Sequence, residues 1–76
     1  MKKLNPTTYR VYVFIRDYIA TNERLSPTLR EIAEGCHMGH TSLLPHLARL
    51  EAMEWIIREI GRARTIRLGS RAPDAR

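Results

Sequence analysis

The fold is decided between residues 27 and 50, which read PTLREIAEGCHMGHTSLLPHLARL. Near the start of this stretch, Thr28 and Glu31 have the spacing of a capping box, in which each side chain bonds the backbone amide of the other residue. They predict a short helix that ends near Gly35. The residues expected on the apolar side of this helix are Leu29, Ile32, Ala33 and Cys36.

The second half of the stretch predicts a longer helix, whose pattern continues to about Met53. Its inward residues have the spacing of one helical face and are Leu43, His46, Leu47 and Leu50. Because a proline inside a helix costs about 3 kcal/mol or more, we expect this helix to start late. Thr41 or Ser42 would then be its N-cap, and Pro45 would lie in the first turn. A short helix, a turn of about four residues and a longer helix form a helix-turn-helix unit.

Outward from this unit, the sequence predicts one further helix before it and a hairpin after it. Asn5 is a good N-cap and Pro6 suits the first helical position, and an apolar stripe then runs to about Thr21. After the unit, Glu54 stands where winged helices often have a left-handed glycine, so a less regular helix end is expected. A β-prone run over residues 55–59, a turn at 60–63 and an alternating run over 64–68 predict the hairpin.

The predicted fold class is therefore mostly α, a small α+β winged helix-turn-helix with three helices followed by a two-stranded β-hairpin wing. A chain of 76 residues has room for one domain, which we place at residues 1–68. Residues 69–76 have no periodicity and are expected to form a flexible basic tail. The apolar runs of the sequence are too short for a membrane span, and the N-terminal segment lacks the apolar stretch of a secretory signal. A single cysteine suits a reducing cytoplasm.

The positive charge is concentrated near the end of the chain. Residues 1–57 carry seven Lys/Arg against six Asp/Glu, whereas residues 58–76 carry six Arg against two acids. Arginine forms forked hydrogen bonds that suit phosphates and guanine edges. The placement favours a nucleic-acid partner, and a merely solubilising tail is the alternative.

Three of these segments resemble a known family. Residues 14–19, 27–33 and 61–68, in that order, are similar to the N-terminal DNA-binding domain of the LexA repressors, and the likeness covers roughly residues 4–68. The resemblance implies a bacterial or phage transcriptional repressor in the cytoplasm, associated with the nucleoid. It would bind a short palindromic operator as a homodimer, with its third helix in the major groove and the wing on the neighbouring backbone.

The resemblance has two limits. The self-cleaving peptidase domain of that family, which supplies its dimer contact, has no counterpart among these residues, so autoproteolysis and that contact are not carried over. Leu44 and Pro45 also stand where the family usually has polar or charged base-contacting residues, so no target sequence is transferred.

The recognition helix of a helix-turn-helix points its outward side chains at base edges. The outward residues predicted here to contact DNA are His40, Thr41, Ser42, Pro45 and Arg49. Thr41 and Ser42 would bond bases or phosphates unless one is only the N-cap, and Arg49 would reach a phosphate or a guanine. Leu44 and Pro45 could touch thymine methyl groups but cannot donate hydrogen bonds. Alternatively, this face binds a protein.

The wing and the start of the short helix complete the predicted DNA-binding set. Its remaining members are Thr28, Arg30, Arg62, Arg64 and Arg67. Arginines on a wing position a protein on the duplex without reading its sequence. Arg30 would make a further phosphate contact, or would be a solvated or ion-paired surface residue.

Other function classes find less support in the sequence. Cys36, His37 and His40 are metal-ligand types, but structural zinc normally takes four ligands, and His46 is expected to face inward, so no metal or other cofactor is predicted. No nucleophile with a base, phosphate loop or carboxylate pair indicates an enzyme or a small-molecule substrate. The alternative to a DNA-binding regulator is a winged-helix protein-interaction module, such as a phage or replication accessory factor.

Overall fold

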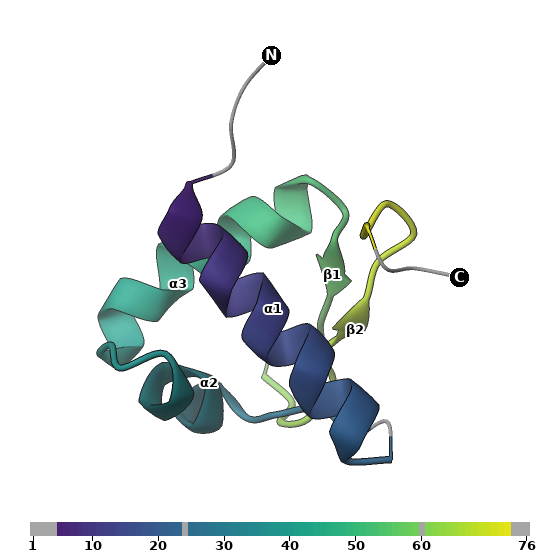
Figure 1. The fold of residues 1–76 in the computed structure, drawn as a ribbon, viewed down its shortest axis with the longest axis horizontal. Coiled ribbons are helices and arrows are strands. Elements are labelled where there is room, and N and C mark those ends of the chain that lie inside the picture. Colours follow the sequence, from purple (N-terminus) through teal and green to yellow (C-terminus); the bar gives the residue numbers. More distant parts are fainter. Residues whose placement is uncertain (1–4, 24, 60, 74–76) are drawn as a thin grey trace.

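A computed structural model describes residues 5–23, 25–59 and 61–73. Three helices are followed by two antiparallel strands, in a winged-helix-like layout (Figure 1). Their bounds are α1 Pro6–Thr21, α2 Leu29–Gly35, α3 His40–Ala52, β1 Ile56–Ile57 and β2 Arg67–Leu68. The predicted fold class is confirmed. Within the described residues, no helix is both long and apolar enough to span a bilayer.

Local capping sets the first two helices where the sequence predicts them. The Asn5 side chain accepts hydrogen bonds from the backbone amides of Thr7 and Thr8, at 2.8 and 3.4 Å, and so satisfies amides that have no partner within α1. At α2 the Thr28 hydroxyl accepts from the Glu31 amide at 3.1 Å, and the Glu31 carboxylate accepts from the Thr28 amide at 2.8 Å. The predicted capping box is confirmed.

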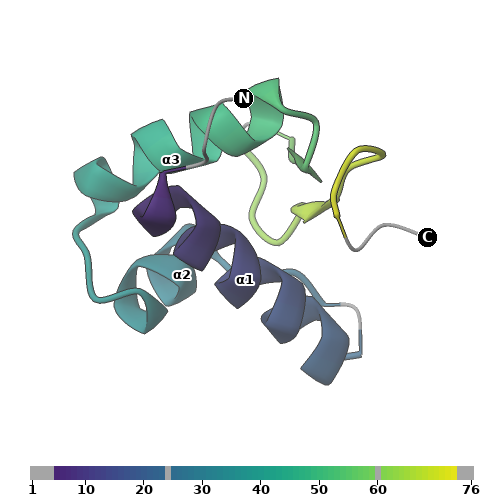
Figure 2. The ribbon, with the colours of Figure 1, turned by 45° about the horizontal axis from the view of Figure 1, so that its top comes forward.

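The three helices bury one shared core. Helix α1 crosses in front of α3 in Figure 1, with α2 at the lower left, and α3 lies across the top of Figure 2 with α1 and α2 beneath it. The side chains with no exposed area include Val11, Tyr12, Ile15, Ile32, Leu43, Leu47 and Leu50. Cys36 is buried among them, as its place on the apolar side of α2 predicts. The ring of Tyr12 meets that of Trp55 edge-on, with ring centres 5.0 Å apart.

The late start predicted for α3 is wrong. The helix begins at His40 with Gly39 as its N-cap, so Pro45 is an interior residue and neither Thr41 nor Ser42 caps the helix. The Leu43 amide donates to the Gly39 carbonyl at 3.1 Å, which places the fully buried Leu43 in the core. Pro45 is exposed, so the Thr41 carbonyl that its missing N–H leaves unpaired can bond water instead. Core packing therefore outweighs the local cost of the proline.

Helices α2 and α3 both end through a non-glycine residue in the left-handed region. His37 has φ 57° and Glu54 has φ 61°. The next amide in each case bonds back five residues, from Met38 to Ala33 at 2.9 Å and from Trp55 to Leu50 at 3.0 Å. This bond is the signature of a Schellman ending, in which glycine usually takes the left-handed position. The less regular helix end expected at Glu54 is wrong, because α3 ends in a regular Schellman turn with Glu54 in the left-handed position. His37 takes the same conformation at the end of α2.

The wing has shorter strands than the sequence predicts. Only Ile56 pairs with Leu68 and Ile57 with Arg67. The connection over residues 58–66 is held instead by Thr65, whose hydroxyl accepts from the Glu59 amide at 3.0 Å and donates to the Glu59 carbonyl at 3.2 Å. A side chain thus replaces the ladder that longer strands would have formed.

The tail predicted from Gly69 onward begins as packed structure. The Gly69 amide donates to the Trp55 carbonyl at 2.7 Å, and the Arg71 amide donates to the Glu54 carbonyl at 3.0 Å. Ala72 is buried in the core. The expectation of a flexible tail is wrong for residues 69–72, because a short alanine with no apolar periodicity around it gave no sign of burial. Residues 74–76 of that tail lie outside the described residues.

Candidate nucleic-acid interface

Helix α3 divides into a buried face and an exposed face. Leu43, Leu47 and Leu50 have no exposed area. The residues predicted from the sequence to face outward are all exposed: His40, Thr41, Ser42, Pro45 and Arg49. Leu44 and Ala48 are exposed beside them. With Thr41 and Ser42 inside the helix rather than capping it, the structure assigns them no capping role.

The exposed face of α3 carries no acidic group. The helix contains one acid, Glu51, and that residue is only partly exposed. The Nε of Arg58 lies 3.2 Å from a Glu51 carboxylate oxygen and neutralises it. This pair joins the end of α3 to the start of the wing connection and was not predicted from the sequence. A polyanion approaching the exposed face would therefore meet no negative side chain of α3.

Exposed arginines also lie on other elements of the domain. Arg30 is exposed in the first turn of α2, and Arg67 is exposed on β2. The Arg62 side chain in the wing connection is 74% exposed, and its guanidinium lies 3.7 Å from the carboxylate of Glu59, three residues earlier in the sequence. An ion pair this exposed contributes little and does not immobilise the arginine. These three cations are available to a partner in solution.

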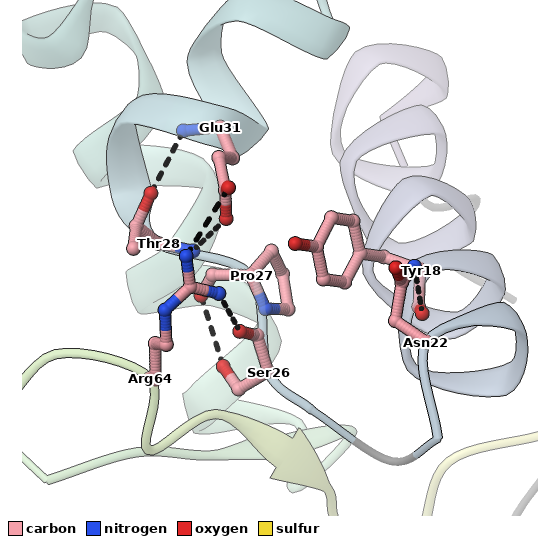
Figure 3. A network of polar contacts seen from close by, with 7 residues as sticks. All are labelled: Tyr18, Asn22, Ser26, Pro27, Thr28, Glu31 and Arg64. Carbon is pink, nitrogen blue, oxygen red and sulfur yellow. Dashed lines mark hydrogen bonds and ion pairs between the residues drawn. The ribbon is translucent and has the colours of Figure 1, made fainter.

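Arg64 is placed differently from the other predicted wing arginines. Figure 3 shows its guanidinium lying between the start of α2 and the loop before it. One nitrogen donates to the Ser26 carbonyl at 3.0 Å, and another lies 3.3 Å from the Glu31 carboxylate. Its backbone has φ 57°, in the left-handed region. Arg64 therefore ties the wing connection to the body of the domain.

Ser26 completes this anchor. Its hydroxyl is buried, accepts from the Ile66 amide at 3.0 Å and donates to the Pro27 carbonyl at 2.9 Å (Figure 3). The wing is thus fixed to residues 26–31 at two points: the Arg64 guanidinium bonds the Ser26 carbonyl and the Glu31 carboxylate, and the Ile66 amide bonds the Ser26 hydroxyl. Neither contact has a signal in the sequence, because the partners lie 38 and 40 residues apart.

The electrostatics of the anchor keep Glu31 ionised. The pKa of Glu31 is lowered, chiefly by the hydrogen bond from the Thr28 amide and further by the Arg64 guanidinium. Thr28 is partly buried, and its hydroxyl oxygen already accepts from Glu31. Of the residues predicted at this edge, Thr28 and Arg64 thus have structural roles, whereas Arg30 faces solvent.

The cysteine and histidines considered as metal ligands are not gathered into a cluster. Among the described residues, no group of three or more His, Cys, Asp or Glu side chains is arranged to hold a metal ion. Burial raises the pKa of the Cys36 thiol, and the Cys36 carbonyl accepts from the Arg10 guanidinium at 2.9 Å. His46 is partly buried as predicted, and its Nδ1 lies 2.7 Å from the hydroxyl of the buried Thr8.

Comparison with known proteins identifies no family for this chain. No protein-family model matches it, and no curated protein matches it at a significant level.

Proposed function

We propose that the chain is a sequence-specific double-stranded DNA-binding regulator of transcription, acting as a repressor. The observation that carries this proposal is the exposed face of α3, which holds Arg49 and no acidic side chain, together with exposed arginines on α2, the wing connection and β2. Helix α3 would enter the major groove and the wing would lie on the phosphate backbone. The resemblance of residues 14–19, 27–33 and 61–68 to LexA-type domains supports the same assignment.

The dimensions of α3 suit this role. Its 13 residues make a rod about 20 Å long, and the major groove is about 12 Å wide, enough to admit one helix. The residues nearest its N-terminus, His40 to Ser42, carry hydrogen-bonding side chains where a recognition helix meets the base edges. Arg49, two turns further on, would reach a guanine or the phosphates flanking the groove.

The arginines divide into two roles in this proposal. Arg30, Arg62 and Arg67 are exposed and would contact phosphates, which position the protein without reading sequence. Arg64 would set the position of the wing through its bonds to Ser26 and Glu31. The wing would consequently meet the backbone as a preformed surface.

The repressor role, the bacterial or phage origin and a place on the nucleoid in the cytoplasm rest on the family resemblance. A homodimer on a palindromic operator would also follow from it. Half-sites one helical turn apart are separated by about 34 Å. Because the domain is itself 33 Å long in its largest dimension, two copies on such half-sites could touch.

The test is selection from a random duplex library in the presence of competitor DNA at moderate salt. The proposal expects one enriched motif, with an affinity that falls steeply as salt rises. Replacing Arg62 with Ala should weaken all sequences alike and reduce the salt slope by about one unit.

Arg71→Ala is the matched control, because the Arg71 side chain is 75% exposed against 74% for Arg62. Arg71 follows β2 in the sequence, and Figure 1 draws the segment after β2 on the opposite side of the domain from the turn between α2 and α3. It should leave the slope unchanged. If the library yields no enriched duplex, sequence-specific DNA binding is wrong, and equal effects of the two variants would refute the placement of the wing.

A further inference from the structure

The middle of the exposed face of α3 is apolar. Leu44, Pro45 and Ala48 are exposed, and with Thr41 they have the spacing i, i+3, i+4 and i+7 that places residues on one side of a helix. Leu44 is among the few exposed large hydrophobic residues of the described chain, at 37%. The hydrogen-bonding side chains of α3 lie to either side of this patch, at residues 40–42 and at Arg49.

The three apolar side chains restrict what the helix can recognise. Leu44 and Ala48 have no polar side-chain atom, and Pro45 lacks even a backbone N–H. Most groups on the base edges in the major groove are hydrogen-bond donors or acceptors. The exception is the C5-methyl group of thymine, which is the apolar feature that an apolar helix face can match.

The patch is also suited to close contact at little entropic cost. Alanine and proline lose no side-chain rotamer freedom when they are buried, and leucine loses little compared with longer polar side chains. The absence of acidic side chains on this face, with Glu51 neutralised by Arg58, allows the patch to approach a polyanion. The same face carries the exposed cation Arg49, so charge complementarity favours duplex DNA as the occupant over a protein helix.

On the basis of the proposed DNA binding, we propose that Leu44, Pro45 and Ala48 recognise thymine methyl groups in the major groove. Discrimination between sequences then rests on methyl contacts at the centre of α3, flanked by hydrogen bonds from its ends. The target contains thymine beneath this part of the helix on at least one strand.

The experiment replaces each thymine of the enriched duplex, one at a time, with deoxyuridine, which removes the C5-methyl group and leaves every hydrogen-bonding atom in place. At the contacted positions, loss of one buried methyl group should weaken binding about fourfold. Deoxyuridine at positions outside the motif should leave the affinity unchanged.

A protein variant links the effect to the patch. In Leu44→Ala, the ratio of the affinity for the thymine duplex to that for the deoxyuridine duplex should shrink towards one at the contacted position. The circular dichroism and melting temperature should stay close to those of the parent. Leu25→Ala is the matched control, since Leu25 is also exposed, at 58%, but precedes α2 rather than lying on α3. This control should retain the full difference.

The outcomes separate the two proposals. An enriched motif whose affinity ignores deoxyuridine, or one that lacks thymine under α3, overturns methyl recognition and leaves DNA binding standing. An undiminished thymine-to-uracil difference in Leu44→Ala assigns the methyl contact to other residues and also overturns the inference. A library that enriches no duplex overturns both proposals.

Discussion

Three glycines provide a test of the backbone geometry, because the same substitution by alanine should have three different effects. A Cβ atom on Gly69 would lie 2.2 Å from the Glu54 carbonyl oxygen and 2.7 Å from its carbon. Both are backbone atoms, so no side-chain rotation relieves the overlap. A Cβ on Gly39 or Gly61 meets nothing within 4 Å, but Gly61 has φ +85°.

The magnitude at Gly69 follows from what its movement breaks. The segment would lose the bond from Gly69 to Trp55 and the bond from Arg71 to Glu54, about 1 kcal/mol each. Displacing the buried Ala72 methyl group would cost about 0.8 kcal/mol more. The total is about 3 kcal/mol, against a total stability on the order of 4–11 kcal/mol for a domain of this length.

The other two substitutions should cost less. Gly61→Ala puts a side chain into the left-handed region, which costs about 1 kcal/mol. At Gly39, φ is −77° and suits any residue, so the weaker capping by alanine and its smaller unfolded-state entropy should cancel to within about 0.5 kcal/mol.

Thermal unfolding followed by circular dichroism measures the series. About 1 kcal/mol shifts the midpoint by about 4–8 °C in a domain of this size. The expected order is a large fall for Gly69→Ala, a moderate fall for Gly61→Ala and little change for Gly39→Ala. If Gly69→Ala unfolds at the same midpoint temperature as Gly39→Ala, the packing of residues 69–72 on the end of α3 is wrong.

Four further predictions concern single side chains. Arg64→Ala should lower the midpoint of thermal unfolding by less than Gly69→Ala does, because the bonds of Arg64 to residues 26–31 are partly exposed. It should also change the slope of DNA affinity against salt concentration less than Arg62→Ala does. An equal reduction of that slope by the two variants would make Arg64 a phosphate contact. Since the folded pKa of Glu31 is lowered, its contribution to stability is present above the unfolded pKa and is lost as pH falls through the folded value. Urea titrations from neutral to acid pH should show this loss in the parent and less of it in Glu31→Gln; parallel curves would contradict it. Pro45→Ala restores an N–H to the interior of α3 and should raise the free energy of unfolding by about 1–3 kcal/mol in urea denaturation, whereas a fall would mean that the proline ring packs favourably. Burial and the raised pKa of Cys36 should make its alkylation by iodoacetamide slow in the native protein and fast in urea, and equal rates would show that the thiol is accessible.

Features fixed by neighbouring residues were predictable from the sequence. The Asn5 cap and the Thr28–Glu31 box act within four residues, so their pattern sets the first turns of α1 and α2 wherever the helices pack. Such signals are local and survive in almost any tertiary context.

Features that depend on contacts between distant parts of the chain were not predictable from the sequence. The start of α3 went against the local rule for Pro45 because Leu43 is needed in the core. Ala72 is buried in a core cluster that includes residues far from it in the sequence, such as Val11 and Leu43, and no periodicity around it indicates a partner.

The candidate interface shows the same division. Exposure of His40, Thr41 and Ser42 followed from the helical period of the leucines on the other face. The role of Arg64 could not be derived, since charge and a place near the hairpin tip describe Arg62 equally well. What separates the two arginines is the carbonyl of Ser26 and the carboxylate of Glu31, which come close only after the chain has folded.

The edge-on pair of Tyr12 and Trp55 gives the domain an optical reporter of its own. Trp55 is the one tryptophan of the chain and stands between the end of α3 and β1, with its ring centre 5.0 Å from that of the buried Tyr12. Its emission therefore monitors the junction between helix and wing without a label. A titrant that moves the wing relative to α3 would change this fluorescence, whereas one that binds a rigid domain would leave the spectrum as it is.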